Sequence, residues 1–139
     1  MKVFVDSDVI ISSLLSSVGA SFFLLNHTGI DLYVSNFSIQ ELENVVKGLG
    51  IDSNQLSDLI EKKFHIVEIK KTFKEIKKEF GKNVVDENDA HIVAGAHLAK
   101  VRFLVTYKGK DFKTDVIKED FDILVMKPGQ LMQYMRSLG

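Results

Sequence analysis

Several acidic residues occupy positions from which their carboxylates could act together. Asp6 directly follows the apolar run VFV, and Asp111 follows the stretch FLVTYKGK. The other candidates are Asp8, Glu41, Asp86 and Asp89. Carboxylates gathered in one cleft repel each other unless they are protonated or bridged by a cation. Oxygen ligands in a chain without cysteine favour Mg²⁺ or Mn²⁺ over Zn²⁺, so these residues suggest a divalent-cation site.

The elements that must position these acids can be predicted from the hydrophobic pattern. Five apolar, β-branched stretches predict strands over Val3–Val5, Asp31–Ser35, His65–Ile69, Arg102–Val105 and Phe121–Val125. Amphipathic stretches predict helices over Val9–Leu15, Ala20–His27, Ser38–Gly48, Ser53–Lys63, Thr72–Phe80, Glu87–Lys100 and Pro128–Leu138. This alternation indicates an α/β domain with a mainly parallel sheet. Nearly continuous apolar strands are typical of a sheet covered by helices on both faces.

The predicted order of elements brings the acids to one edge of the sheet. In an open parallel sheet, ligands bind beyond the carboxyl ends of the strands. Asp6 follows the first strand, Glu41 lies on the helix after the second, and Asp111 follows the fourth. Asp86 and Asp89 begin the helix that leads into the fourth strand. We therefore expect one acidic cluster at this edge.

Each acid also has a simpler structural interpretation. Asp86 could be the N-cap of its helix, with Asp89 as a capping-box partner. Acids in a first helical turn gain roughly 0.3–1 kcal/mol from the helix dipole without any further function. Glu41 could be an ordinary solvent-facing helix residue. The prediction of a site therefore depends on the set of acids and not on any single one.

Length and composition limit the classes of protein to consider. The 139 residues are 45% hydrophobic and 27% charged, with a net charge of −1. We expect a single domain over residues 1–139 that needs neither disulfides nor a structural metal. No apolar run is long enough for a transmembrane helix, and the opening MKVFVDS does not resemble a signal peptide. A cytoplasmic protein without membrane contact is expected.

Three blocks of the sequence resemble PIN-domain ribonucleases, the family that contains the VapC-like toxins of type II toxin–antitoxin systems. The blocks are VFVDSDVIISSLL, SNFSIQELENVV and DENDAHIVAGAHLAKVRFLVTYKGKDF. The third block is the most specific, because it combines an Asp-Ala pair, a helix of small residues, a strand ending in Val-Thr and an Asp-Phe pair. The resemblance implies a three-layer PIN-like fold whose five-stranded sheet has the order 3-2-1-4-5, with the first and fourth strands adjacent at the switch point.

The resemblance also implies roles for individual residues. Asp6, Glu41 and Asp89 match the family's metal-binding acids, which would hold Mg²⁺ or Mn²⁺ and serve catalysis. Asp111 matches the aspartate of the Asp-Phe pair and is expected to be a further catalytic carboxylate. The implied activity is divalent-metal-dependent hydrolysis of RNA phosphodiester bonds by an endoribonuclease. The implied partners are an RNA substrate, a cognate antitoxin and a second copy of the chain in a homodimer.

Other positions are expected to support this site. Asp86, Asp8 and Asp111 are candidates for a second metal or for orienting the first set of ligands, and Ser7 and Thr106 for positioning carboxylates by hydrogen bonds. Many relatives have Asn at the position of Asp8 and Asp or Asn at the position of Lys108. Lys108 could place its own charge in a second-metal position or contact a phosphate.

Signals for the substrate and the partners are weaker. Lys108, Lys110 and Lys113 are candidates for contact with the RNA backbone, since they follow the fourth strand. The lysine-rich residues 70–82 could contact phosphates, although a solvated helix face explains them more simply. Residues 22–25, FFLL, are expected in the core but could serve an interface. None of the four histidines is assigned a catalytic role.

Two alternative functions compete with an active nuclease. A PIN-like module with impaired catalysis could bind RNA or a protein partner, and Lys108 is the residue that motivates this alternative. A haloacid-dehalogenase-like phosphatase could use the motif DSDVI, with Asp6 as nucleophile and Asp8 as acid/base. That family expects Thr or Val at the position of Ile10, and the late block fits it poorly.

Overall fold

The computed structural model describes all 139 residues. Its strands are β1 (Lys2–Val5), β2 (Asp31–Ser35), β3 (Phe64–Val67), β4 (Phe103–Val105) and β5 (Leu124–Met126). Its α-helices are α1 (Ser7–Leu15), α2 (Ala20–Leu25), α3 (Asn36–Gly48), α4 (Ser53–Lys63), α5 (Phe73–Phe80), α6 (Ala90–Leu98), α7 (Thr114–Phe121) and α8 (Pro128–Ser137). Short 3₁₀ helices are η1 (Gly81–Asn83), η2 (Glu87–Asp89) and η3 (Gly109–Asp111). No helix combines the length and apolar character needed to cross a bilayer.

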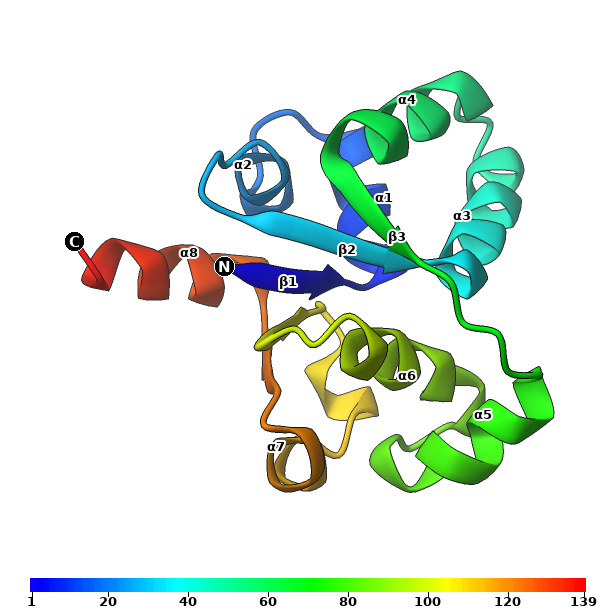
Figure 1. Cartoon of the computed structure of the whole chain (residues 1–139). Helices are drawn as coiled ribbons and strands as arrows, with labels where there is room; N and C mark the ends of the chain where they lie inside the picture. The colour runs from blue at the N-terminus through cyan, green and yellow to red at the C-terminus, as the bar shows by residue number, and fades with distance from the viewer.

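The strands form one fully parallel sheet in the order β3-β2-β1-β4-β5. This confirms the fold expected from the sequence, including the strand order. β1 is central, with Phe4 opposite Tyr33 of β2 on one side and Leu104 of β4 on the other. The chain reverses its direction of winding between β1 and β4, so a switch point lies at their carboxyl ends. Helices cover both faces of the sheet, as Figure 1 shows.

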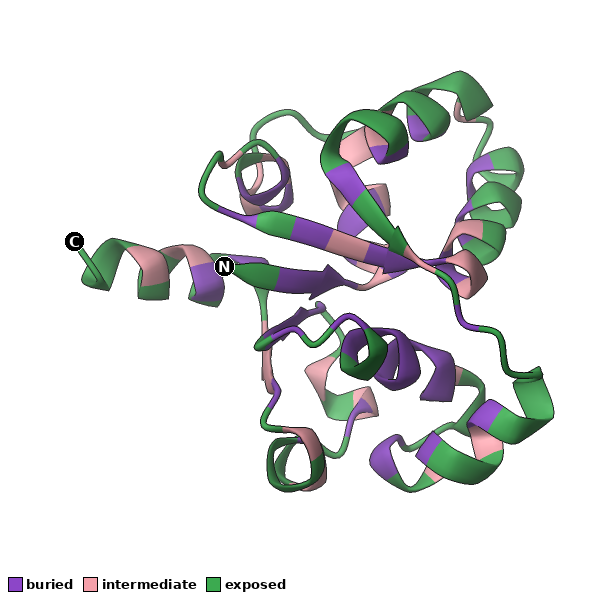
Figure 2. Ribbon diagram, viewed as in Figure 1, coloured by how far each residue is buried: buried purple, intermediate pink, exposed green.

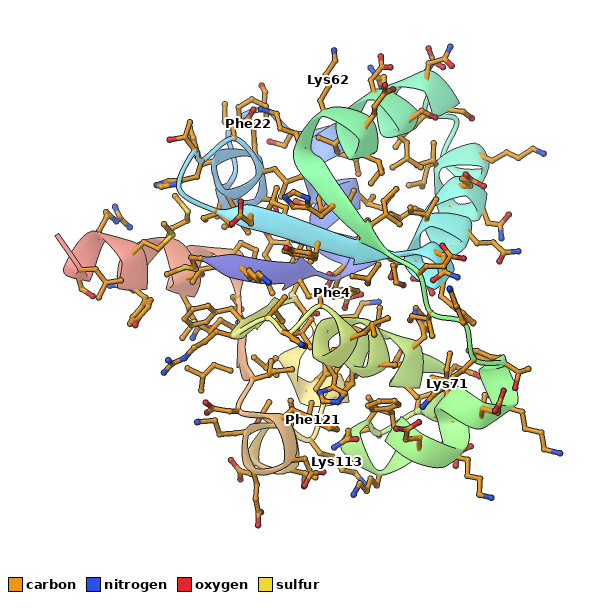
Figure 3. The ribbon with its side chains drawn as sticks, viewed as in Figure 1. Phe4, Phe22, Lys62, Lys71, Lys113 and Phe121 are labelled. Carbon is orange, nitrogen blue, oxygen red and sulfur yellow. The ribbon has the colours of Figure 1, made fainter.

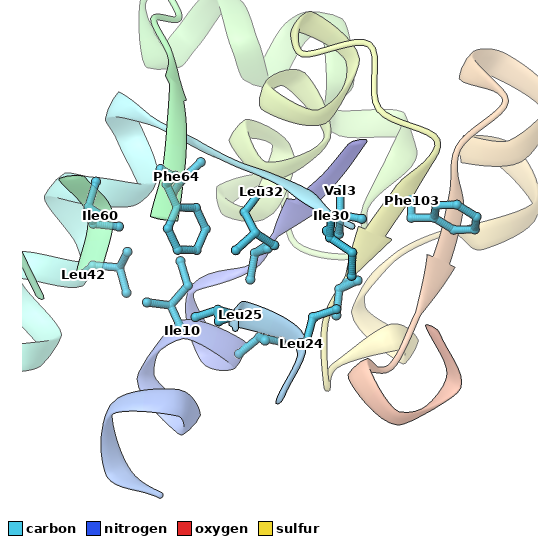
Figure 4. Close-up of a cluster of buried hydrophobic side chains, with 14 of the residues drawn as sticks. Val3, Ile10, Leu24, Leu25, Ile30, Leu32, Leu42, Ile60, Phe64 and Phe103 are labelled. Atoms are coloured by element: carbon cyan, nitrogen blue, oxygen red, sulfur yellow. The ribbon is translucent and has the colours of Figure 1, made fainter. Parts of the chain in front are cut away.

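The core on one face of the sheet is built mainly by the first half of the chain, to which β4 and the last helix add side chains. Val3 and Val5 of β1 point to this face, where they meet apolar side chains from α1, α2, α3 and α4. Leu131 of α8 is fully buried in the same cluster. Figure 4 shows part of this core, with Ile10, Leu24 and Leu42 converging on the sheet. The alternation of side chains along β1 sends the residue between the two valines to the opposite face.

The core on the other face depends on α6, which lies directly against β1. Phe4 points into this layer (Figure 3), beside buried residues of α5, α6 and α7. Seven of the nine residues of α6 are buried, as its colour in Figure 2 shows. A Cβ atom on Gly95 would lie only 2.6 Å from Cζ of Phe4. The helix therefore needs glycine here in order to approach the sheet.

The main error of the sequence-based prediction is in the last third of the chain. A strand over Phe121–Val125 was expected, but Phe121 ends α7 and the strand begins only at Leu124. Helix α7 itself was not predicted. Asp122, which lies between the two elements, has a left-handed backbone with φ of 57° that ends the helix and turns the chain into β5.

Other boundaries differ by a few residues. The third strand runs over Phe64–Val67 and not His65–Ile69, and the fourth begins at Phe103 and not Arg102. The helix expected from Glu87 is split into η2 and α6, so its first turn is a 3₁₀ turn. This tighter turn carries Asp89, the acid of greatest interest in this segment.

Candidate active site

The acids predicted to cluster do line one cavity, of about 550 Å³, at the carboxyl edge of β1 and β4. Its polar lining residues are Asp6, Ser7, Asp8, Glu41, Asp86, Asp89, Lys108 and Asp111, and its apolar ones are Ile11, Val45 and Phe112. Thr106 is buried behind this lining and reaches it through a hydrogen bond to Asp6. Lys110 and Lys113 do not line the cavity, so the structure does not join them to this site.

Asp6 is held rigidly at the end of β1. It is the N-cap of α1, where its Oδ1 accepts a 2.8 Å hydrogen bond from the backbone N–H of Ser7. The Thr106 hydroxyl donates a 2.8 Å hydrogen bond to Oδ2, and the backbone N–H of Lys108 in turn donates to the Thr106 oxygen at 3.0 Å. The predicted positioning role of Thr106 thus has a direct structural counterpart. Ser7 acts through its backbone, since its hydroxyl is buried without a hydrogen-bond partner.

The environment of Asp6 opposes its negative charge. Burial is the largest cause that raises its pKa, to about 7, and the neighbouring charge of Asp8 adds to the rise. The hydrogen bonds from Thr106 and Ser7 act in the opposite direction. A carboxylate in this state is stabilised by any cation that approaches it, because the cation offsets both the lost hydration and the repulsion.

Asp8 connects the first turn of α1 to the segment after β4. Its Oδ2 accepts a 3.0 Å hydrogen bond from the backbone N–H of Tyr107. Its Oδ1 is buried with no hydrogen-bond partner, and burial raises the pKa of the carboxyl. The nearby charge of Lys108 partly opposes this rise. Asp8 therefore uses one carboxylate oxygen to hold the segment after β4, and its other oxygen has no partner at the site.

Asp86 and Asp89 occupy the turn that leads into α6. Asp86 is the N-cap of η2, where its Oδ1 accepts a 3.0 Å hydrogen bond from the backbone N–H of Asn88. The simpler interpretation of Asp86 as a capping residue is thus confirmed. Asp89 makes no such side-chain cap, and burial followed by repulsion from Asp86 and then Asp111 raises its pKa.

Hydrogen bonds join the segment just before η2 to the segment at the end of η3. Val84 and Phe112 form an isolated antiparallel bridge, and the Val85 N–H donates a 3.0 Å hydrogen bond to the carbonyl of Asp111. These backbone contacts explain why Asp89 and Asp111 lie close together although they are more than twenty residues apart in the chain. The charge of Asp111 is near enough to raise the pKa of Asp89.

Glu41 approaches the cavity from α3 and contacts a histidine that the sequence-based prediction left without a role. Ser35 caps α3 by accepting the backbone N–H of Ser38 at 3.1 Å, which fixes the start of the helix. The Nε2 atom of His91 lies 3.4 Å from Oε2 of Glu41. Hydrogen bonding with His91 is the largest cause that lowers the pKa of Glu41. A histidine inside the apolar run AHIVAGA was the available signal, because a buried imidazole requires a polar partner.

The donor set fits a hard divalent cation. It consists of carboxylate oxygens, among them the unpartnered Oδ1 of Asp8 and the buried carboxyl of Asp6, whose charge is unfavourable without a counter-ion. No three acidic or imidazole groups come close enough to share one ion in the observed side-chain positions. An ion held in these positions would therefore be bound by fewer protein side chains and would keep several waters, as Mg²⁺ usually does.

Comparison with known proteins assigns the family. A family model described as PIN domain matches residues 2–109 of the chain, which is most of its length. The protein belongs to the PIN-domain family. Among solved structures, this PIN-domain protein is similar to a chain in the crystal structure of VapBC2 from Rickettsia felis bound to a DNA fragment from their promoter. That match has 14% sequence identity and a TM-score of 0.61, and covers 90% of this chain and 97% of the other. No curated protein matches the sequence significantly.

Family membership favours the PIN-type alternatives over the phosphatase. The motif DSDVI, which motivated the phosphatase, lies within the matched residues, and its second aspartate is bound to the backbone of Tyr107. Asp6, Glu41, Asp86, Asp89 and Lys108 also fall within the matched stretch. Asp111 lies just beyond it, yet lines the same cavity.

Proposed function

We propose that this PIN-domain protein is a divalent-metal-dependent endoribonuclease that hydrolyses RNA phosphodiester bonds. The observation that carries the proposal is the convergence of Asp6, Glu41 and Asp89, from three different elements, on one cavity at the switch point of the sheet. Burial and like charge raise the pKa of both Asp6 and Asp89, so a bound cation would stabilise their charged forms. The PIN-domain match supports a nuclease over other hydrolases.

In this proposal Asp6, Glu41 and Asp89 hold Mg²⁺ or Mn²⁺. When bound, such an ion acidifies water and neutralises phosphate oxygens. Thr106 keeps one oxygen of Asp6 fixed, so the carboxylate faces the cavity in one orientation. Asp111 and Asp86 line the same cavity and orient the attacking water or a second ion. Their repulsion of Asp89 keeps this part of the site attractive to positive charge.

Lys108 is assigned to the substrate. It is the only cationic lining residue of the cavity, and its charge lies near Asp8 and Glu41. A lysine in this position can neutralise a phosphate that enters beside the carboxylates. The same lysine supports a second candidate, a PIN module with impaired catalysis that binds RNA, because its charge competes with a second metal ion.

The first prediction tests the nuclease directly. Asp89→Asn removes one carboxylate charge while keeping the shape of the side chain, so Mn²⁺-dependent RNA cleavage should fall by at least about 100-fold. The melting temperature without metal should be unchanged or slightly higher, because repulsion from Asp86 and Asp111 is removed. Cleavage of labelled RNA and of matched DNA, with and without Mn²⁺, gives the rates.

Asp115→Asn is the matched control. Asp115 is an exposed acid in the first turn of α7 and is not part of the cavity, so this variant should cleave RNA like the wild type. Wild-type activity in Asp89→Asn would contradict the assignment. A wild-type protein that binds RNA without Mn²⁺ and does not cut it would support the impaired module instead.

We further propose that the partner of this nuclease is an antitoxin protein and that the chain forms a homodimer. The structural similarity to a chain of the VapBC2 complex supports an antitoxin. The surface of α1 and α2 and of the loop between them offers an apolar docking area, since Leu15, Val18 and Phe23 are exposed there. Leu15 also lines a groove of about 580 Å³. Leu24 and Leu25 of α2 are buried in the core, so the run FFLL serves both the core and this surface.

A further inference from the structure

His91 is a buried polar residue in the middle of the otherwise apolar helix α6. Only 6% of its side chain is exposed, and its neighbours on the helix are alanine, isoleucine, valine and glycine. Its Nδ1 atom is buried without a hydrogen-bond partner. A buried unpaired polar atom lowers the stability of the fold, so packing alone does not account for histidine at this position.

Two aromatic rings determine the orientation of the imidazole. The ring of Phe37 on α3 stacks on it at 6.0 Å between centroids with an interplanar angle of 26°, and the ring of Phe73 on α5 lies at 6.4 Å. These contacts come from two different helices, both of which precede α6 in the chain. They restrict rotation of the ring and direct Nε2 at Glu41, 3.4 Å away.

Glu41 needs such a restraint more than Asp6 and Asp8 do. Asp6 is fixed by two hydrogen bonds and Asp8 by one, but no hydrogen bond from a backbone N–H reaches the Glu41 carboxylate. Its side chain is 46% exposed and has more freely rotating bonds than an aspartate. Without the imidazole, the carboxylate would spread over several rotamers pointing into solvent.

We propose that His91 is a positioning residue that holds the carboxylate of Glu41 over the acidic cavity by donating a hydrogen bond from Nε2. The effect of this contact on metal binding rests on the proposed function, whereas the contact between His91 and Glu41 does not depend on it. His91 stands two residues after Asp89 on the same helix start. A shift of α6 would therefore move Asp89 and the anchor of Glu41 together, so the two carboxylates keep their separation.

The proposal requires a donor at Nε2 and leaves Nδ1 as a bare acceptor in an apolar environment. This arrangement excludes Nδ1 as a ligand to the proposed ion, since that atom is sealed from the cavity. The imidazole contacts the site through Glu41, and His91 also acts through space to lower the pKa of Asp89.

The test compares His91→Phe and His91→Gln. The first keeps an aromatic ring between Phe37 and Phe73 but cannot donate, whereas the second can donate through its amide. In metal-free, isotope-labelled protein, three-bond couplings of the Glu41 side chain should report one dominant rotamer in the wild type. They should report averaging over several rotamers in His91→Phe and partial recovery in His91→Gln. Unchanged couplings in His91→Phe would overturn the proposal.

The consequence for metal binding is measured separately by calorimetry with Mn²⁺. His91→Phe should weaken Mn²⁺ binding by about 10-fold or more, which is the usual effect of losing a partner that orients a ligand. In a Glu41→Ala background the same substitution should have no further effect, because the group that His91 holds is gone. His97→Phe, an exposed position on the same helix, is the control and should bind like the wild type.

The two measurements separate failure of this inference from failure of the proposed function. If the wild type binds no Mn²⁺ and cuts no RNA, the proposed function is wrong, yet the couplings still decide whether His91 holds Glu41. If the wild type binds Mn²⁺ and His91→Phe binds it equally well with an unchanged melting temperature, the positioning role is wrong and the nuclease stands.

Discussion

At the scale of single residues, Asp6 combines the roles of helix cap and candidate metal ligand, and these roles have opposite effects on stability. As a cap it satisfies a backbone N–H at the start of α1. As a buried acid beside Asp8 it has a pKa raised to about 7, chiefly by burial. The folded protein therefore binds a proton at Asp6 more tightly than the unfolded chain does.

The sign of the resulting pH dependence follows from linkage. A raised carboxyl pKa contributes stability that is fully present below pH 3.8, the ordinary pKa of the group, and is lost as the pH rises through about 7. Asp6→Asn keeps the cap and removes the titrating charge. Metal-free Asp6→Asn should therefore be more stable than the wild type at about pH 8, by on the order of 2 kcal/mol, although inactive.

The measurement is urea unfolding of both proteins at several pH values in the presence of a chelator. The advantage of Asp6→Asn should shrink as the pH falls toward about 5, where Asp6 is protonated in the folded wild type. Asp115→Asn, an exposed position outside the cavity, is the control for the substitution itself. A wild type that is equally or more stable than Asp6→Asn at high pH would contradict the assignment.

Prediction from sequence worked for residues whose position follows from the end of a strand or the start of a helix. Asp6, Glu41 and Asp89 were found because parallel strands deliver such residues to one edge. The contact of His91 with Glu41 could not be predicted, because it depends on how α3 packs across α6. The backbone contact of Asp8 depends similarly on the path of the segment after β4.

At the scale of elements, the closeness of α6 to β1 is set by Gly95. A Cβ atom there would lie 2.6 Å from Cζ of Phe4, which is fully buried. Gly95→Ala should lower the free energy of unfolding by about 1–3 kcal/mol, because the overpacking outweighs the gain in helix propensity. Since α6 begins directly after Asp89, the same shift should weaken Mn²⁺ binding.

Gly48→Ala provides the matched control. Gly48 is also helical, at the end of α3, but nothing lies within 4 Å of a Cβ atom placed there. This substitution should leave stability unchanged or raise it by up to about 1 kcal/mol. Urea unfolding of the two variants gives both values, and a Gly95→Ala protein as stable as the wild type would show that Phe4 gives way freely.

Helix α7 and the start of β5 were mispredicted for a physical reason. Helix α7, TDVIKEDF, buries a single residue fully, Ile117, so its sequence has too little apolar periodicity to stand out from a loop. The apolar residues of FDILV resemble a strand, but the left-handed turn at Asp122 divides them between two elements. Turn conformations at residues other than glycine leave little trace in a single sequence.

At the scale of the whole molecule, the acidic cavity and the apolar α1–α2 surface are separate features that start from the same helix. Asp6 and Asp8 begin α1, whereas Leu15 ends it. A partner docked on Leu15, Val18 and Phe23 would therefore lie at the far end of the helix that carries the candidate metal ligand.

The partner surface can be tested by a single charge. Phe23 is 54% exposed, so Phe23→Glu should not disturb the fold, but should abolish co-purification with the antitoxin proposed as its partner. Leu98→Glu is the control, because Leu98 is 50% exposed on α6, outside this surface. Loss of the partner in both variants, or in neither, would argue against docking on α1 and α2.

The position of α8 in the fold has a consequence in time. Leu131 of this last helix is needed to complete the core that β1, α1 and α2 began more than a hundred residues earlier. During synthesis that core stays open over α2 until the ribosome has made Pro128–Ser137. All the acids of the cavity are translated before α8. The nascent chain therefore carries every candidate catalytic carboxylate before the core on this face of the sheet is complete.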